Sequence, residues 1–357
     1  MKPKVRYKVI GLMSGTSLDG LDIACCEFTR GKVWDFRLQS ALTFAYSPAW
    51  KRKLRSAHTL SGSALMELHA AYGKLMGAFC NRFIKLQRIS GLDAVASHGH
   101  TIFHQPGNSF TFQLGDGASL HAVTGLPVVS NFRALDVALG GEGAPLVPVG
   151  DRLLFSNYDA CLNLGGIANI SMDIKGQRKA FDIAFCNMSL NYLMHQVNKA
   201  FDHGGKTAAS GKINQALLKA FSQRYAEYRL KRPSLAREMF EVSFQPLLDN
   251  KKITLADRLR TVCESVAIEI EAAVPRSRPL RLLATGGGAL NTFLVNLLKE
   301  KLMGKAELIL PPRSVIEFKE AIIFAFLGVL RLRNEMNVLR SVTHARRDSS
   351  SGSLVGR

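Results

Sequence analysis

The chain has 357 residues, of which 47% are apolar and 21% charged, so it can form a large core or two domains and is not disordered throughout. Its 47 Lys and Arg against 28 Asp and Glu give a net charge of +19. The basic residues are scattered, and no zinc-finger, RNP-type or basic-zipper pattern accompanies them. We therefore expect an enzyme whose positive field attracts anions such as nucleotides, with no nucleic-acid partner.

Several function classes are excluded by the remaining composition. No apolar run is long enough to span a bilayer, and residues 1–8 lack the apolar core of a signal peptide. The six cysteines form no CxxC pair and lie mostly in apolar stretches. We expect a soluble cytoplasmic protein with reduced cysteines, and no membrane partner.

Short apolar segments alternate with helical patterns through the first half of the chain. Strands are predicted over residues 5–13, 21–28, 34–44, 94–96 and 127–130. Asp19-Gly20 separates the first two strands, and Asp-Gly is a strong tight-turn dipeptide. Residues 64–86 carry apolar side chains at helical spacing and are predicted to form a long helix.

The second half repeats this alternation. Strands are predicted over residues 160–164, 167–172 and 282–284. Helices are predicted over residues 187–200, 212–225, 255–273 and 316–332, with another from Asn291. The tail from Ser341 is rich in Ser, Gly and Arg, and we expect it to be loose at its end.

Each half of the chain opens with a strand, a Gly-containing turn and a second strand, over residues 9–28 and 160–172. This repeat indicates a divergent duplication, and the alternating elements indicate α/β layers with mostly parallel sheets. We expect an N-terminal lobe over residues 1–157 and a C-terminal lobe over residues 158–357, with the last helix packing back on the first lobe. Two such lobes would place their Gly turns on opposite sides of one cleft.

The segment from Gly11 to Asp22 is the first candidate for chemistry. Its small residues let backbone N–H groups approach a phosphate closely. Thr16 and Ser17 add hydroxyls, and Asp19 or Asp22 could hold Mg²⁺ through water. The alternative is a plain β-hairpin with Ser and Thr as turn formers, and the pattern alone leaves the two near even. A P-loop is excluded, because no Gly-Lys-Ser/Thr follows a glycine at the required spacing.

Two further Gly turns lie in the second half. Gly165-Gly166 separates two predicted strands and could face a γ-phosphate. Gly286-Gly287-Gly288 stands at a strand-to-helix junction, where backbone can approach adenosine or phosphate with help from the helix N-terminus. One Gly triplet is a weak signal, but three Gly turns in a two-lobed α/β chain together favour a nucleotide site.

The loop from Gly140 to Leu146 places small residues around one acid, Glu142, shortly after Arg133 and Asp136. This composition indicates a tight loop with a functional role, and the alternative is a structural crossover loop. The pattern leaves both open.

Three histidines and one aspartate are further candidates. His98, His100 and His104 lack the carboxylate or Cys that would complete a metal set, so hydrogen bonding of a substrate by His98 is favoured over metal binding. Asp182 follows Phe181 at the end of a strand and is a candidate general base.

Together these motifs resemble the anhydro-N-acetylmuramic acid kinase family. The matching segments are residues 11–22, 97–99, 113–116, 131–133, 140–148, 162–169, 181–182, 187, 209–211, 286–291 and 341–343. They cover nearly the whole chain in order. The family belongs to the actin, hexokinase and heat-shock ATPase superfamily, so the resemblance implies two ribonuclease-H-like lobes around a central ATP cleft.

The resemblance also implies a reaction in peptidoglycan recycling. Water would open the 1,6-anhydro bridge of anhydro-N-acetylmuramic acid while oxygen 6 takes the γ-phosphoryl group of ATP, giving N-acetylmuramic acid 6-phosphate. Asp182 would deprotonate the attacking water, as the base of an inverting glycosidase does. A homodimer is a further implication of the family.

The family motifs assign two groups of binding residues. Those for ATP and Mg²⁺ are Gly11, Ser14, Gly15, Thr16, Ser17, Asp19, Gly20, Asp22, Gly165, Gly166, Gly286, Gly287, Gly288 and Asn291, with Asp19 holding the metal through water. Those for the sugar are His98, Arg133, Glu142, Asn187 and Glu320. The fork of Arg133 suits the lactyl carboxylate or sugar hydroxyls.

The chain departs from the family pattern after Asp182. The family usually continues with Thr-Gly-Pro-Gly-Asn, whereas this chain has Ile183-Ala184-Phe185-Cys186-Asn187. We expect Phe185 to reshape the sugar pocket. His100 stands where Gln is common, and Leu290 where Arg is common. Two alternatives therefore remain open: a kinase of another sugar in the same superfamily, or a non-catalytic nucleotide-binding protein.

Overall fold

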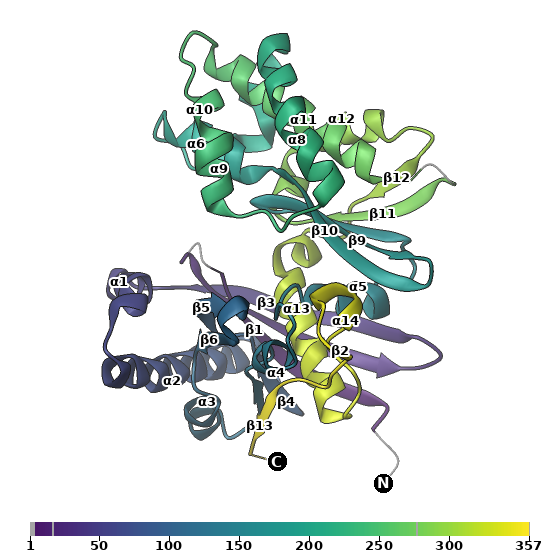
Figure 1. The fold of residues 1–357 in the computed structure, drawn as a ribbon. Coiled ribbons are helices and arrows are strands. Elements are labelled where there is room, and N and C mark those ends of the chain that lie inside the picture. Colours follow the sequence, from purple (N-terminus) through teal and green to yellow (C-terminus); the bar gives the residue numbers. More distant parts are fainter. Residues whose placement is uncertain (1–3, 16–17, 276–277, 357) are drawn as a thin grey trace. The chain divides into compact units, whose positions relative to one another are not determined.

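The structure is a computed structural model that describes residues 4–15, 18–275 and 278–356. It consists of two compact units: unit 1 comprises Met1–Ser156 and Phe318–Arg357, and unit 2 comprises Asn157–Glu317 (Figure 1). The chain thus leaves unit 1 after Ser156 and returns to it within its last long helix.

Unit 1 contains a six-stranded sheet in the order β13-β7-β4-β1-β2-β3. Its strands are β1 (Arg6–Ser14), β2 (Gly20–Arg30), β3 (Trp34–Ala45), β4 (Ala94–Ser97), β7 (Val128–Ser130) and β13 (Ser353–Val355). The first three form an antiparallel meander, and β4 and β7 continue the sheet parallel to β1. A separate hairpin is formed by β5 (His100–Gln105) and β6 (Phe110–Leu114).

Helices cover both faces of this sheet. They are α1 (Pro48–Ser56), α2 (Gly62–Gln87), α3 (Gly117–Thr124), α4 (Ala134–Ala138), α5 (Val147–Leu154), α13 (Arg313–Leu332) and α14 (Arg340–Thr343). On one face, Ile10 and Leu12 of β1 pack in a cluster with Tyr72 and Met76 of α2. The intervening Gly11 lies against α13, where an added Cβ would be 1.9 Å from the carbonyl oxygen of Ala321. Because successive residues of a strand face opposite sides of the sheet, β1 contacts α2 on one face and α13 on the other.

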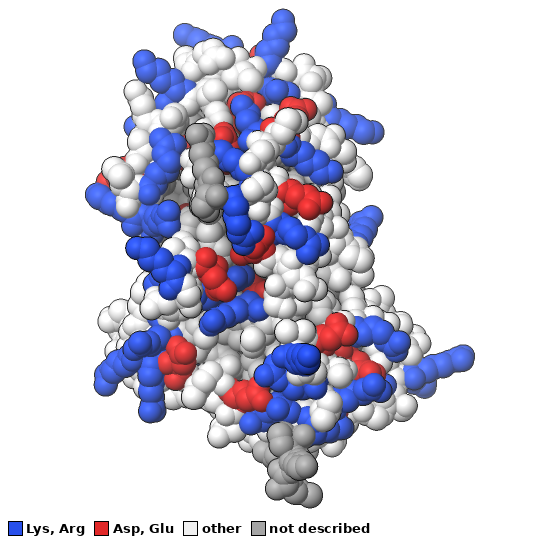
Figure 2. Space-filling model, turned by 90° about the vertical axis from the view of Figure 1, so that its right-hand side faces the viewer, with Lys and Arg blue, Asp and Glu red and all other residues white. Residues whose placement is uncertain are grey.

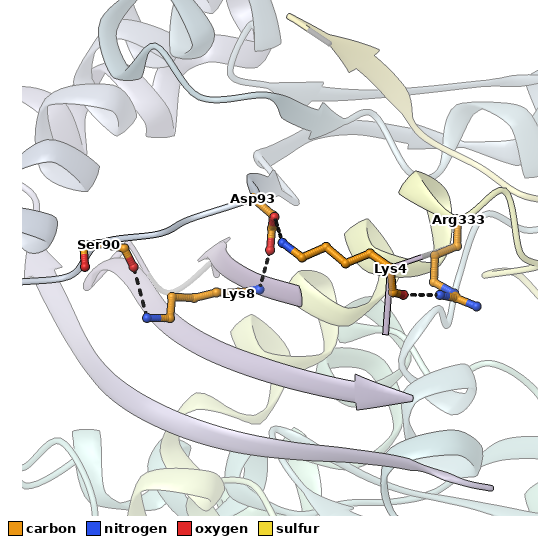
Figure 3. A network of polar contacts seen from close by, with 5 residues as sticks. All are labelled: Lys4, Lys8, Ser90, Asp93 and Arg333. Atoms are coloured by element: carbon orange, nitrogen blue, oxygen red, sulfur yellow. Dashed lines mark hydrogen bonds and ion pairs between the residues drawn. The ribbon is translucent and has the colours of Figure 1, made fainter. Parts of the chain in front are cut away.

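A polar network fixes the start of β1 (Figure 3). The backbone N–H of Lys8 donates to the Asp93 carboxylate at 2.8 Å. In return, the backbone N–H of Asp93 donates to the Lys8 carbonyl at 2.8 Å. The Lys8 ammonium donates to the Ser90 carbonyl at 3.0 Å, and the Arg333 guanidinium donates to the Lys4 carbonyl at 2.7 Å. These bonds join the entry to β1, the segment before β4 and the end of α13.

Unit 2 contains a five-stranded sheet in the order β10-β9-β8-β11-β12. Its strands are β8 (Ala160–Leu164), β9 (Ile167–Ile174), β10 (Gln177–Phe185), β11 (Leu280–Thr285) and β12 (Ala306–Ile309). The first three are an antiparallel meander, and β11 and β12 are parallel to β8. The order and directions are those of β3-β2-β1-β4-β7 in unit 1, so the predicted duplication is confirmed.

The helices of unit 2 gather on one side of its sheet (Figure 1). They are α6 (Asn187–His195), α7 (Lys206–Ser210), α8 (Gln215–Lys231), α9 (Arg237–Ser243), α10 (Gln245–Leu248), α11 (Leu255–Ala273) and α12 (Thr292–Lys301), with short 3₁₀ turns at His203–Gly205 and Gly287–Leu290. The most buried of them is α11, whose face from Leu259 to Ile270 joins the core.

Several elements differ from the sequence-based predictions. The two main sheets are mixed and not mostly parallel, because each contains an antiparallel meander of three strands. The tail is not loose, because Ser353–Val355 pairs antiparallel with β7 and covers an edge that would otherwise be open. The helix predicted over residues 187–200 ends at His195, and Asn198 shortly after it has a φ of 56°. The helix predicted from residue 212 begins at Gln215, because the Asn214 side chain caps it. Strands β5, β6 and β12 were not predicted. Asp182 was predicted at the end of a strand, whereas β10 continues to Phe185.

Candidate active site

Two Gly turns of unit 2 meet at the carboxyl ends of the parallel strands β8 and β11. Gly286 has a φ of 82°, and a Cβ there would lie 2.4 Å from the Asn163 side-chain oxygen. A Cβ on Gly288 would lie 2.8 Å from that of Leu164. Asn187 at the start of α6 donates to the Leu164 carbonyl at 2.8 Å. Only glycine allows these backbones to approach so closely, and the contact brings Gly165, Gly166, Asn187 and the triplet together.

Beside these turns lies a pocket of about 410 Å³. Its walls are formed by Asn187, Leu190, Asn191, Phe201, Asp202, His203, Gly204, Gly287, Leu290, Asn291 and Arg313. Asn291 caps α12, since its side chain accepts from the Leu294 N–H at 3.1 Å. The volume suits a nucleoside-sized ligand, and the lining combines apolar surface with a few polar groups. Three residues predicted for ligand binding, Asn187, Gly287 and Asn291, therefore share one pocket.

Asp182 lies on β10 in a separate hollow of about 80 Å³, lined also by Tyr228 and Arg229 of α8 and by Glu269 of α11. Its carboxylate accepts a hydrogen bond from the backbone N–H of Leu235 at 2.9 Å. Burial raises the pKa of Asp182 above its ordinary value, and the hydrogen bond opposes that rise. The Asp182 side chain is thus half-buried and hydrogen-bonded, and its role as a general base stays a prediction.

The unusual loop after Asp182 is part of the unit 2 core. Strand β10 continues to Phe185, with a bulge between Asp182 and Ala184. Phe185 is fully buried, its ring contacts those of Phe240 and Phe244, and its N–H donates to the Tyr225 hydroxyl at 3.0 Å. The expectation that Phe185 reshapes a sugar pocket was wrong, because its side chain fills the aromatic core under the helices.

In unit 1, Arg133 is held in a fixed orientation. Its Nε and one Nη donate to Nε2 of His98 at 3.0 and 2.8 Å, and the other Nη donates to the Gly143 carbonyl at 2.7 Å. His98 Nδ1 lies 2.9 Å from the Gly99 carbonyl and therefore carries the ring proton. Burial and the Arg133 charge lower the pKa of His98 well below its ordinary value. His98 is thus a neutral, buried acceptor that orients the guanidinium.

The two acids predicted for sugar binding have different surroundings. Burial lowers the pKa of Arg133 to about 10, and the charge of Glu320 on α13 opposes that shift. Glu142 is exposed, and its carboxylate lies 2.9 Å from Nδ1 of His344. Of these two acids, Glu320 is therefore the one whose charge acts on Arg133.

The hairpin between β1 and β2 is anchored by buried contacts at its base. The Ser14 hydroxyl is 2% exposed and lies between Nδ1 of His100 at 2.9 Å and the Tyr46 hydroxyl at 2.8 Å. Tyr46 in turn bonds the Tyr72 hydroxyl at 2.6 Å. A Cβ on Gly20 would lie 2.6 Å from the Phe44 carbonyl. These residues support the hairpin from beneath.

The described residues near the tip of the hairpin differ in their exposure. Gly15 is half-buried and Asp19 is exposed, while Asp22 accepts from the Thr43 hydroxyl at 2.5 Å. Thr16 and Ser17, which were predicted to contact phosphate, lie outside the described residues. Within the described part of the chain, no group of three or more His, Cys, Asp and Glu side chains could hold a metal ion by itself.

Some contributors carry no local sequence signal. His203 and Arg313 line the large pocket, and Tyr46 and Tyr72 support the hairpin, yet each stands in an ordinary surface or core pattern.

The distribution of charge was easier to predict. Figure 2 shows Lys and Arg spread over the visible face with Asp and Glu among them, and no stripe of one sign. Among the described helices none is long and apolar enough to cross a membrane.

The two units share one strand order and one set of strand directions, which defines an α/β protein built from two related lobes. More specifically, the family described as anhydro-N-acetylmuramic acid kinase matches residues 7–356, and the chain belongs to this family.

Relatives of the same description cover the chain almost end to end. The anhydro-N-acetylmuramic acid kinase of Vibrio vulnificus strain CMCP6 is 32% identical, with 98% of each chain covered. That of Xylella fastidiosa is 35% identical over 94% of this chain and 93% of its own. Among solved structures, a ROK family glucokinase from Streptomyces griseus aligns at 12% identity and a TM-score of 0.41, covering 90% of this chain and 98% of its own.

Proposed function

We propose that this chain uses ATP to convert 1,6-anhydro-N-acetylmuramic acid into N-acetylmuramic acid 6-phosphate in peptidoglycan recycling. The observation that carries the proposal is the family match, which extends over residues 7–356. Two relatives with this name match over 98% and 93% of their own length. The six cysteines are all buried, which fits a reducing cytoplasm.

For the nucleotide, we assign the adenosine to the unit 2 pocket that contains Asn187, Gly287 and Asn291. Gly15 and Asp19 at the hairpin tip suit phosphate contacts, and the exposed Asp19 carboxylate offers the hard oxygen that Mg²⁺ takes through water. Bound Mg²⁺ would neutralise charge on the phosphates. These assignments suit phosphoryl transfer, because that reaction depends mainly on the positioning of the phosphates and the neutralisation of their charge.

For the sugar, we assign the lactyl carboxylate to Arg133, whose fork is already oriented by His98 and Gly143. Asp182 takes the proton of a water whose oxygen bonds to the anomeric carbon, and the bond from that carbon to oxygen 6 breaks. Oxygen 6 takes the γ-phosphoryl group, and ADP leaves. No separate acid is needed, because the phosphoryl group captures the departing oxygen.

The direct test is a phosphorylation assay with ATP and the anhydro-sugar, run beside glucose and N-acetylglucosamine. We expect turnover of the anhydro-sugar alone, with loss of activity when EDTA removes Mg²⁺ and recovery when Mg²⁺ is restored. Turnover of the ordinary hexoses without the anhydro-sugar would instead favour a different sugar kinase. We also propose that the chain forms a homodimer, as the family resemblance implies. Light scattering in solution would measure the mass and test this proposal.

A further inference from the structure

The C-terminal segment wraps the stretch of unit 1 that carries Arg133. Thr343, the last residue of α14, accepts the backbone N–H of Glu142 at 2.7 Å and donates its hydroxyl to Asp136 at 2.8 Å. Two more bonds join the same stretches: Arg346 N–H to the Leu139 carbonyl at 3.2 Å, and the Ser351 hydroxyl to the Phe132 carbonyl at 2.6 Å. The segment is therefore fixed along residues 132–142.

Asp136 is the centre of these contacts. It is fully buried, and its two carboxylate oxygens accept from the Thr343 hydroxyl and from the Gly143 N–H, each at 2.8 Å. A Cβ on Gly141 would lie 2.4 Å from one of those oxygens, so the loop closes tightly around the carboxylate. Burying a carboxylate costs free energy unless it is hydrogen-bonded. The Thr343 hydroxyl supplies one of the two hydrogen bonds described above for the Asp136 carboxylate.

From Asp136 the contacts continue to Arg133 through one residue. Gly143, whose N–H binds Asp136, presents its carbonyl to the Arg133 guanidinium at 2.7 Å. Its φ of 66° and the 2.7 Å approach of a Cβ to Val137 leave this backbone little room to move. A displacement of Gly143 would therefore move the acceptor that holds one arm of the guanidinium.

We propose that Thr343 is a positioning residue for Arg133, acting through Asp136 and Gly143. The proposal rests on the proposed function, in which Arg133 binds the carboxylate or hydroxyls of the sugar. Without the Thr343 hydroxyl, Asp136 keeps one donor, the loop at Gly143 relaxes, and the guanidinium loses its alignment. The nucleotide pocket is lined by residues of unit 2, so the effect falls on the sugar and spares ATP.

The test compares Thr343→Val, which replaces the hydroxyl by a methyl group, with Thr343→Ser, which restores the hydroxyl. We expect KM for the sugar to rise roughly tenfold in the first variant, since the lost bond goes to a charged group, and to recover in the second. KM for ATP should stay unchanged in both. Thr124→Val is the matched control, because the Thr124 hydroxyl bonds only the local Leu120 and Leu126 backbone.

A double-mutant cycle with Arg133→Lys tests whether Thr343 acts through Arg133. We expect Thr343→Val to add little to the sugar KM once Arg133 is Lys, because the fork it positions is gone. Additive effects, or a sugar KM unchanged in Thr343→Val while the wild type is active, would overturn the inference alone. A wild type that does not turn over the anhydro-sugar would overturn the proposed function, and this inference with it.

Discussion

The carboxylate of Asp182 and the backbone N–H of Leu235 are joined by a hydrogen bond of 2.9 Å. Leu235 belongs to the segment between α8 and α9, so this bond ties the candidate base on β10 to a loop beyond the sheet. It also favours the ionised carboxylate, against a burial that favours the neutral acid. The pair thus sets both the orientation and the protonation of Asp182.

The first prediction concerns the pH dependence of the rate. Burial raises the pKa of Asp182, and a base acts only as the carboxylate, so kcat/KM should fall as pH falls through that raised pKa. The acid limb should therefore lie above the ordinary aspartate range. Circular dichroism at each pH would separate this limb from unfolding. A rate that stays level down to about pH 4, the ordinary carboxylate range, would contradict the role of Asp182.

The second prediction concerns Arg133→Lys. Lys keeps the charge but lacks the fork that bonds His98 and Gly143 together, so the ammonium should sit poorly for the sugar. We expect KM for the sugar to rise by about 10- to 100-fold, with KM for ATP unchanged. Arg82→Lys on the exposed side of α2 serves as the control. Equal rises in both KM values would argue against a sugar-specific role.

The third prediction concerns Phe185, which fills the unit 2 core. Phe185→Ala should lower the free energy of unfolding by about 3–5 kcal/mol through the lost transfer energy and the cavity left behind. Urea unfolding measures this loss, and Leu230→Ala, at a side chain 88% exposed, should change little. KM of the folded fraction should not change. A changed KM for the sugar with unchanged stability would contradict this account and indicate that Phe185 contributes to the sugar site.

The fourth prediction concerns His100 beneath the hairpin. Burial lowers the pKa of His100 to about 4, whereas the unfolded chain has an ordinary histidine pKa near 6.5. The unfolded state therefore takes up the proton first, and the stability that His100 contributes above pH 6.5 is lost as pH falls towards 4.

His100→Gln should flatten the fall of unfolding free energy over that interval, by up to about 1 kcal/mol per pH unit. Chemical denaturation at a series of pH values measures it, with the exposed His195→Gln as control. If both variants keep the wild-type slope, the burial of His100 does not govern the pH dependence of stability.

The fold was predictable where local pattern decides it, and unpredictable where distant segments pair. The two strand–turn–strand openings and the helix around Tyr72 follow from apolar periodicity. The pairing of Leu354 with Val129 does not, because the tail is short, polar and remote in sequence from its partner. The period of a segment does not reveal which edge of a sheet remains open.

The site divides in the same way. Gly286 could be predicted, since a strand followed by a Gly triplet indicates a close backbone approach. The direction of Phe185 could not, because the residue follows an acid in a family motif and only the bulge in β10 turns it into the core. The support of Ser14 by Tyr46 was likewise invisible, since it depends on the packing of three separate elements.

The most direct test of the account is mass spectrometry of the product formed from 1,6-anhydro-N-acetylmuramic acid and ATP, by the wild type and by Asp182→Asn. The account predicts a wild-type product that has gained both water and a phosphoryl group. It predicts at least a 100-fold slower reaction in the variant, the lower end of general-base effects, with the fold intact. A product that gains only the phosphoryl group, or a variant as active as the wild type, would contradict it.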